Sequence, residues 1–373
     1  MANFLSSITN LFNKKSVSVL GIDIGSSSIK IVQVSKKNGR AVLETYGELA
    51  LGPYTGKGVG ESVALPQEKI IEAIGDMLKE KEVNITTLTC GVAIPFSSSL
   101  MAVIDMPVVP RKELEQMIPL EARKYVPVPI SEVTLDWYII PEDKNTKPLS
   151  PDESEKIKPQ LEVLIVALHN DTISKYKNIV SKTGLDVGFF EIEIFSTMRS
   201  VLDQETTPVL VIDMGASSTK LYMVERGILR ASHMVERGSY DITNELSKSL
   251  GISLTDAEYL KREKGLLGET NGIQLKDVAS FTLNYIFTEA ERFMVTYQKK
   301  YNKDVTKVSL VGGGSALKGV APFAKDILKT EVVAGDPFSK LLAPAFLEKV
   351  LKETGPEFAV AVGVALRRLQ DLG

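Results

Sequence analysis

The chain contains very few of the residues from which cross-links and structural metal sites are made. Its 373 residues include one cysteine, Cys90, and two histidines, His169 and His233. A single cysteine excludes an intrachain disulfide and fits a reducing compartment. Structural zinc needs a set of cysteine and histidine ligands that this composition does not supply. We therefore expect neither a disulfide nor a zinc site.

Long hydrophobic runs and a strong net charge are also missing. No apolar run reaches the length of a membrane span, no signal peptide is evident, and the formal net charge is −3. The charge balance gives no indication of nucleic-acid binding. Apolar residues make up 44% of the chain and charged residues 24%, as in ordinary soluble proteins, and the length indicates two or more domains. We expect a cytoplasmic protein.

The strongest feature that is present is an internal repeat. Residues 19–34 read VLGIDIGSSSIKIVQV and residues 209–224 read VLVIDMGASSTKLYMV, so the two windows agree at nine of sixteen positions. Each window predicts a hydrophobic strand, a tight turn of small residues and a second strand, with Gly25 and Gly215 at the bends. Because polar and apolar positions are both repeated, the pattern indicates two similar lobes with one shared task.

Each repeated hairpin carries residue types that suit a nucleotide. Short loops rich in glycine and serine let backbone N–H groups and hydroxyls approach phosphate oxygens. An acid ends each first strand (Asp23, Asp213) and can hold a hydrated Mg²⁺, while a lysine opens each second strand (Lys30, Lys220) and can pair with a phosphate. One such hairpin would more often be an ordinary β-hairpin. The repetition favours a cleft in which both hairpins clamp one nucleoside triphosphate.

Two further glycine-rich stretches have different interpretations. Residues 308–311 form an apolar strand that runs directly into Gly312, Gly313, Gly314 and then Ser315. A strand that enters three glycines before a helix is a close-approach loop, and beside two phosphate hairpins it is the expected seat of an adenosine. Residues 52–60, GPYTGKGVG, lack the spacing of a P-loop and are interpreted as a surface turn.

Two segments outside the repeat, residues 1–15 and residues 143–158, are interpreted from their patterns of apolar and charged residues. Residues 1–15 place apolar side chains on one helical face. This predicts a helix or arm that packs on the body or on a partner, and a membrane-surface anchor is the alternative, which two lysines support weakly. Residues 143–158 are rich in lysine, acids, proline and serine and predict a mobile loop between strands.

Two helices are expected to have particular local features. Residues 113–124 predict a helix that Pro119 must kink or break. Thr255 and Glu258 have the spacing of a capping box at the start of another helix, and this does not exclude a role for Glu258 in nucleotide binding.

The order of these motifs resembles the superfamily of actin, hexokinase and the seventy-kilodalton heat-shock chaperones. The resemblance covers nearly the whole chain and implies an α/β fold with two lobes, each a mixed sheet with helices, and ATP with Mg²⁺ in the cleft. A small α+β insert in the first lobe, without a large insert in the second, is similar to the division protein FtsA. The insert sequence from residue 104 to 140 is more specific and resembles the PilM family of type IV pilus assembly proteins. Its matching features are Pro107, the helix of residues 113–125, Pro127 and the Asp136-Trp137-Tyr138 strand.

The resemblance implies a division of the chain into discontinuous parts. The core of the first lobe is expected at residues 1–90 and 168–207, with the inserted subdomain at 91–167. The core of the second lobe is expected at 208–235 and 302–373, with a helical part at 236–301. The last helix of the chain is expected either to stay with the second lobe or to pack back on the first lobe.

The resemblance also implies roles for individual residues. Asp23 and Asp213 would face Mg²⁺ through its waters, and Glu258 and Lys261 would flank the ribose or base. Glu193 on the connecting segment is the candidate catalytic acid near the metal, although Glu191 is equally available. The phosphate-binding residues would be Gly25, Ser26, Ser27, Ser28 and Lys30 from the first hairpin, and Gly215, Ala216, Ser217, Ser218 and Lys220 from the second. The adenosine would lie against Gly312, Gly313, Gly314 and Ser315.

The resemblance finally implies how ATP and a partner are used. No catalytic base is recognisable, because Lys220 occupies a water-orienting position and cannot accept a proton while charged. Slow hydrolysis or none is expected, with ATP acting as a ligand that fixes the lobes. The implied partner is the cytoplasmic tail of an inner-membrane PilN protein, bound as an extended peptide in a groove between the first lobe and the insert. The insert helix would line this groove with Leu114, Met117, Ile118 and Ala122. The alternative is that this face packs on the insert's own sheet, as part of it must.

Several functional alternatives remain open at this stage. The protein would reach the inner face of the cytoplasmic membrane mainly through PilN, and pilus motor ATPases or further copies of the chain are additional candidate partners. An FtsA-like filament-forming or division scaffold is the second function, and a small-molecule kinase of the same fold is the third. Steady-state turnover well above about one per second would favour the kinase.

Overall fold

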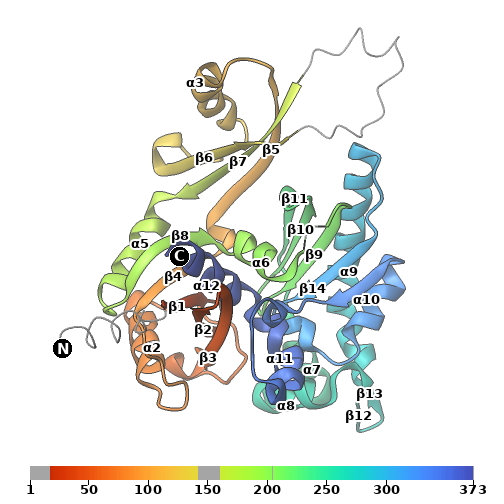
Figure 1. Cartoon of the computed structure of the whole chain (residues 1–373). Coiled ribbons are helices and arrows are strands. Elements are labelled where there is room, and N and C mark those ends of the chain that lie inside the picture. Colours follow the sequence, from red (N-terminus) through yellow and green to blue (C-terminus); the bar gives the residue numbers. More distant parts are fainter. Residues whose placement is uncertain (1–16, 142–159, 204, 373) are drawn as a thin grey trace, which may run out of the picture.

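The computed structural model describes residues 17–141, 160–203 and 205–372 (Figure 1). The helix expected at residues 1–15 and the loop expected at 143–158 lie outside these described residues. Within them the chain forms two five-stranded sheets, a three-stranded sheet and a short two-stranded hairpin.

Each repeated sequence window forms the centre of one five-stranded sheet. The first sheet has the order β3-β2-β1-β4-β8, and the second has the order β11-β10-β9-β14-β15. In both, three antiparallel strands are extended by two parallel ones. The first sheet consists of β1 (Ser18–Ile24), β2 (Ser28–Lys37), β3 (Arg40–Ala50), β4 (Thr89–Ile94) and β8 (Asp186–Ile192). The second consists of β9 (Val209–Met214), β10 (Thr219–Glu225), β11 (Ile228–Val235), β14 (Lys307–Val311) and β15 (Glu331–Ala334).

We call the first sheet with its helices lobe I and the second with its helices lobe II. The predicted α/β fold of two similar lobes is confirmed. Parallel strands must be covered on both faces, and β9, for example, is buried along its whole length. Lobe I is covered on one face by α2 (Gln67–Lys79) and α5 (Asn170–Ser181). Its other face packs against α12 (Ala359–Asp371), which follows lobe II in sequence (Figure 1).

Lobe II is covered on one face by four helices. These are α7 (Ser239–Leu250), α8 (Leu254–Lys264), α9 (Leu275–Tyr301) and α10 (Val320–Leu328). The hairpin of β12 (Glu269–Thr270) and β13 (Ile273–Gln274) precedes α9, and α11 (Glu348–Thr354) lies before α12. The 3₁₀ turns are η1 (Gly52–Thr55), η2 (Phe96–Ser98), η3 (Ile130–Glu132), η4 (Gly265–Leu267), η5 (Gly313–Ala316), η6 (Pro337–Lys340), η7 (Ala345–Leu347) and η8 (Gly355–Phe358).

A smaller sheet with one helix stands above the two lobes (Figure 1). It has the order β5-β7-β6 and is antiparallel throughout, and α3 covers one of its faces. Its elements are β5 (Ser99–Pro107), α3 (Arg111–Ala122), β6 (Val133–Ile139) and β7 (Gln160–His169). We call this unit the insert. The helix α3 continues through the half-buried Pro119, so of the expected kink or break the break does not occur.

The insert is joined in sequence to lobe I, yet it also rests on lobe II. Met101, Val103 and Val166 of its sheet pack in one cluster with Val211 and Tyr222 of lobe II. Glu162 on β7 accepts a hydrogen bond of 2.9 Å from the hydroxyl of Tyr301 and forms an ion pair with Arg230. The insert therefore bridges the two halves of the molecule.

The helix α8 begins in a different way from the one expected. Its N-cap is Ser253, whose Oγ accepts a hydrogen bond of 3.0 Å from the backbone N–H of Asp256. Thr255 lies inside the first turn, and the carboxylate of Glu258 binds Lys261 and Arg262 instead of the helix start. The capping box predicted for Thr255 and Glu258 is therefore wrong, because a serine two residues earlier takes the cap.

Candidate functional site

A cavity of about 280 Å³ lies between the two lobes, and both repeated hairpins line it. The glycine-rich turn after β14 forms another part of its wall. The predicted residues that line it are Asp23, Gly25, Ser26, Ser27, Ser28, Lys30, Glu193, Asp213, Gly215, Ala216, Ser217, Ser218, Lys220, Glu258, Lys261, Gly312, Gly313 and Gly314. Ser315 is outside this lining, and its hydroxyl donates a hydrogen bond of 2.7 Å to the carbonyl of Gly312.

The two hairpins have the same backbone geometry. In each turn the glycine N–H donates to the carbonyl three residues later, at 3.0 Å for Gly25 to Ser28 and 3.0 Å for Gly215 to Ser218. Asp23 is directly opposite Lys30 in the strand register, as Asp213 is opposite Lys220. A side chain at Gly215 would place its Cβ 2.9 Å from the Ser218 carbonyl oxygen, so the tight turn needs glycine there.

The lysines of the two hairpins have different acidic partners. Lys220 Nζ lies 2.8 Å from Glu193 Oε2 and 3.4 Å from Asp213 Oδ2, and both carboxylates are buried while the lysine side chain is 15% exposed. Lys30 Nζ lies 3.1 Å from Oε1 of Glu48 on the neighbouring strand and donates a hydrogen bond of 2.7 Å to Ser28 Oγ. Each lysine is thus positioned at the cavity wall by a carboxylate.

The cavity lining carries more carboxylates than basic groups. The acids are Asp23, Glu48, Glu193, Asp213, Glu258 and Glu357, and the bases are Lys30, Lys220, Lys261 and Arg262. Six acids against four bases leave the lining two negative charges in excess when all are ionised. Burial raises the pKa of Asp23 to about 7, despite the opposing charges of Lys30 and Lys220. Burial also raises the pKa of Glu357. A bound cation would offset the acidic excess of the lining.

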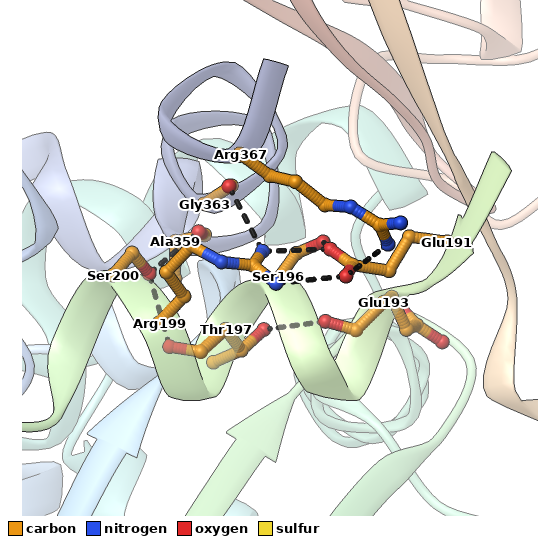
Figure 2. Close-up of polar contacts among 9 residues, drawn as sticks. All are labelled: Glu191, Glu193, Ser196, Thr197, Arg199, Ser200, Ala359, Gly363 and Arg367. Atoms are coloured by element: carbon orange, nitrogen blue, oxygen red, sulfur yellow. Dashed lines mark hydrogen bonds and ion pairs between the residues drawn. The ribbon is translucent and has the colours of Figure 1, made fainter. Parts of the chain in front are cut away.

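Figure 2 separates the roles of the two candidate acids at the start of α6 (Glu193–Val201). The carboxylate of Glu191 binds Arg199 through two hydrogen bonds, and it also binds Ser196 and Arg367. Glu191 therefore ties α6 to α12 and does not line the cavity. Glu193 lines the cavity, where Oε1 accepts a hydrogen bond of 2.7 Å from the N–H of Phe96 and Oε2 binds Lys220.

Glu258 is the centre of a network at the lobe II end of the cavity. Its carboxylate lies 2.6 Å from Lys261 Nζ and 2.7 Å from Arg262 Nε, and it accepts a hydrogen bond of 2.6 Å from Thr243. Lys261 also donates to the carbonyl of Ser239 at 3.1 Å. Burial lowers the pKa of Lys261, although the charge of Glu258 opposes this change.

Sequence reasoning missed several residues of the lining. They are Glu48, Gly60, Ser239, Arg262, Ala316, Leu317, Pro356, Glu357, Ala359 and Val360. Glu48 could have been found from its strand position opposite Lys30. Gly60 belongs to the stretch interpreted as a surface turn. That interpretation is wrong for Gly60, because this residue lies against Glu258 and lines the cavity.

The residues expected to form a peptide groove are placed unequally. Leu114, Ile118 and Ala122 are buried in the core between α3 and the insert sheet. They cannot line an open groove in this structure, because the apolar face of α3 covers its own sheet. Met117 is half-buried at the edge of that core. Leu120 on α3 is 60% exposed and Tyr138 on β6 is 53% exposed, so each presents an apolar side chain to solvent.

The described residues contain neither a candidate membrane span nor a cluster of metal-binding side chains. Across residues 17–141, 160–203 and 205–372, no helix has both the length and the apolar character that a membrane span requires. In the same part of the chain, no group of three or more His, Cys, Asp or Glu side chains is arranged to hold a metal ion.

Comparison with known proteins places the chain in a family. The solved structure of the PilM-PilN type IV pilus biogenesis complex is 25% identical, with a TM-score of 0.75 over 95% of this chain and 99% of that chain. MreB5 of Spiroplasma citri bound to ADP is 11% identical, with a TM-score of 0.50 over 94% of this chain and 95% of that chain. Both confirm the actin-like fold. The cell division protein FtsA of Neisseria meningitidis serogroup B is 24% identical over 301 residues, which are 72% of each chain. Residues 21–369 match the family described as type IV pilus assembly protein PilM, and the chain therefore belongs to the PilM family.

Proposed function

We propose that this protein binds ATP with Mg²⁺ in the cavity between its lobes and serves as an assembly adaptor of the type IV pilus machinery. The observation that supports nucleotide binding best is the meeting of three glycine-containing turns at one cavity, two of them with a lysine and an acid in matching register. Backbone N–H groups in such turns can approach phosphate oxygens closely.

The acidic excess of the lining supports Mg²⁺ as part of the ligand. Mg²⁺ bound by proteins is usually shared between one or two carboxylates, substrate phosphates and water. Asp23 and Asp213, one from each lobe, are the side chains that would face it, and Lys30 and Lys220 would pair with phosphates. Bound Mg²⁺ would neutralise the carboxylates and so join the lobes.

Slow hydrolysis, or none, follows from the surroundings of Glu193. Both of its carboxylate oxygens accept hydrogen bonds, one from the Phe96 N–H and one from Lys220. These two bonds orient the carboxylate toward Phe96 and Lys220, whereas a general base must be oriented toward the attacking water. We therefore assign ATP the part of a ligand that stabilises one arrangement of the lobes.

A thermal-shift experiment tests nucleotide binding. Mg-ATP at about 100 times its Kd should add ~2.7 kcal/mol to the stability of the native state and raise the Tm by about 5 °C. Asp23→Ala should remove most of that rise. Asp186→Ala is the matched control. The Asp186 carboxylate accepts a hydrogen bond from Thr89 and does not line the cavity, so this variant should show the full rise in Tm with Mg-ATP. A wild-type Tm that is indifferent to Mg-ATP would refute the proposal.

We further propose that the partner is an extended PilN-type peptide tail, which binds between the insert and lobe I at the inner face of the cytoplasmic membrane. The solved relative is a complex of PilM with PilN. In this chain β6 is an edge strand of the insert sheet, and Tyr138 on it and Leu120 on α3 are exposed. Within the part of the chain that the structure describes, no further strand pairs with this edge of β6, and an open edge beside an apolar side chain suits an extended peptide.

A charge placed at Met117 tests this surface. Met117→Glu should abolish binding of a PilN-type peptide, as measured by fluorescence anisotropy, because a carboxylate would enter an apolar contact. Gln116→Glu adds the same charge at an exposed neighbouring position and should bind normally. Equal peptide affinity of both variants and the wild type, at unchanged Tm, would remove this surface from the proposal.

A further inference from the structure

The connection between β3 and α2 crosses from lobe I to lobe II, and three of its residues touch the helices there. Glu61 Oε2 accepts a hydrogen bond of 3.1 Å from the hydroxyl of Tyr240, in the first turn of α7. A Cβ on Gly60 would lie 2.5 Å from the carboxyl carbon of Glu258, and a Cβ on Gly58 would lie 3.1 Å from Thr255 Oγ1. We call residues 57–63 the strap.

The chain ahead of the strap and the far end of the strap are both hydrogen-bonded to the turn of the first hairpin. Ahead of the strap, the N–H of Leu51, just before η1, donates to the carbonyl of Ser27 at 2.8 Å. At the far end, the N–H of Val63 donates to the carbonyl of Ser26 at 2.8 Å. The strap is therefore an extension of the turn that is proposed to bind phosphates, and displacement of that turn would move the strap.

The part of lobe II that the strap contacts is held in place by its own network. Glu258 is 6% exposed and is held by Lys261, Arg262 and Thr243, so it cannot yield to the strap easily. Gly60 lines the cavity and has a φ of +84°, a conformation that favours glycine. Within the strap, the second oxygen of Glu61 accepts a hydrogen bond of 2.8 Å from the Gly58 N–H, which fixes the carboxylate toward Tyr240.

We propose that the strap closes the adenosine end of the cavity and that the hydrogen bond between Glu61 and Tyr240 is its latch. This inference rests on the proposed nucleotide binding and adds Glu61, Gly60 and Tyr240 as positioning residues. The latch joins the strap to α7 of lobe II, beside the cavity-lining residue Gly60. A nucleotide that passes this end of the cavity displaces the strap both on arriving and on leaving, so the strap governs both rates more than it governs the affinity.

Loss of the latch hydroxyl gives the first test. In stopped-flow measurements on the full chain with Mg²⁺ and a fluorescent ATP analogue, Tyr240→Phe should raise the association and dissociation rates together by about fivefold, the effect of one lost hydrogen bond. The Kd should stay within about twofold of the wild type, because both rates change. Tyr259→Phe removes a hydroxyl from a 68% exposed tyrosine on α8 and should change neither rate.

A pair of glycine variants gives a second test that does not depend on the latch. Gly56 and Gly60 have similar positive φ values, +74° and +84°, so alanine strains both. Nothing lies within 4 Å of a Cβ at Gly56, whereas a Cβ at Gly60 meets Glu258. Gly60→Ala should therefore hold the strap open and raise the dissociation rate more than Tyr240→Phe does. Gly56→Ala should keep the wild-type rate.

The outcomes distinguish the strap from the site beneath it. If Tyr240→Phe and Gly60→Ala bind the analogue with wild-type rates, the strap is no gate, while nucleotide binding stands. If either variant loses stability without a change in rates, the contact is only structural and the inference is overturned. If the wild type fails to bind the analogue, the proposed function fails and this inference with it. Should Gly60→Ala not fold, Tyr240→Phe decides alone.

Discussion

The two hairpins share one backbone but differ in the way their charges are held. In both, an aspartate and a lysine occupy opposite register positions and a glycine N–H closes the turn. In lobe II, Lys220 lies between two buried carboxylates, Glu193 and Asp213. In lobe I, Lys30 is paired with Glu48, whose side chain is 32% exposed. The turn geometry was kept in both copies, while the surroundings of the lysine were not.

This difference assigns the two copies unequal parts. Lys220 joins α6 to the second hairpin, so it is part of the framework between the lobes as well as of the cavity wall. The pair of Lys30 and Glu48 lies on neighbouring strands of one sheet, where a bound phosphate can compete with Glu48 for the lysine. Substitutions at matching positions should therefore have unequal effects.

The largest difference is expected between the two lysines. Lys220→Met leaves Glu193 and Asp213 buried without their cation and should lower the free energy of unfolding by about 3 kcal/mol. Lys30→Met removes the ion-pair partner of Glu48, which is partly exposed, and should cost about 1 kcal/mol. Urea denaturation of the nucleotide-free protein measures both values. Equal losses would show that the two charge environments are energetically alike.

A smaller effect with a definite pH dependence is expected at Asp23. Its pKa in the folded protein is raised from 3.8 to about 7 by burial, so the folded state holds a proton that the unfolded state has lost. The raised pKa of Asp23 therefore lowers the free energy of unfolding progressively as the pH rises from about 4 to 7, and the full loss is present above that range. Asp23→Asn removes this loss, because asparagine does not ionise.

Denaturation at pH 5, 6.5 and 8 checks this expectation. The nucleotide-free Asp23→Asn variant should exceed the wild type in stability by on the order of 3 kcal/mol at pH 8, with a smaller advantage at pH 5. Asp213→Asn is the matched substitution in the other hairpin. It weakens the ion pair with Lys220 and should lower stability at pH 8. An Asp23→Asn advantage that does not change with pH would contradict the assignment.

The smallest difference is expected between the two turn glycines. A Cβ on Gly25 would lie 3.1 Å from the Ser28 carbonyl oxygen, and a Cβ on Gly215 would lie 2.9 Å from that of Ser218. Backbone oxygens cannot move away as a flexible side chain can, so alanine at either position should cost about 1 kcal/mol, slightly more at Gly215. Thermal unfolding of the two variants compares them, and a stabilised Gly25→Ala would contradict the close contact.

The sequence was sufficient to predict features that are encoded locally. The hairpins were recognisable because strand, glycine turn and charged positions recur in two short windows. Gly60 and Glu357 were not recognisable, because each reaches the cavity through the packing of segments that are distant from the hairpins in sequence. The face of α3 was a different problem. Periodicity showed an apolar stripe, but it could not show that Leu114 and Ile118 cover the insert's own sheet instead of a partner.

The crossing of α12 over lobe I has a consequence for how the chain matures. Val362 and Ala365 complete the packing around Val19 and Val32, although more than three hundred residues separate them in sequence. On the opposite side, Gly363 lies so close to Ser196 that an added Cβ would be 1.8 Å from that residue's carbonyl oxygen. During synthesis, one face of the lobe I sheet therefore stays uncovered until α12 has left the ribosome. Neither half is then an independent folding unit, and a chain cut before residue 359 loses part of the half that was made first.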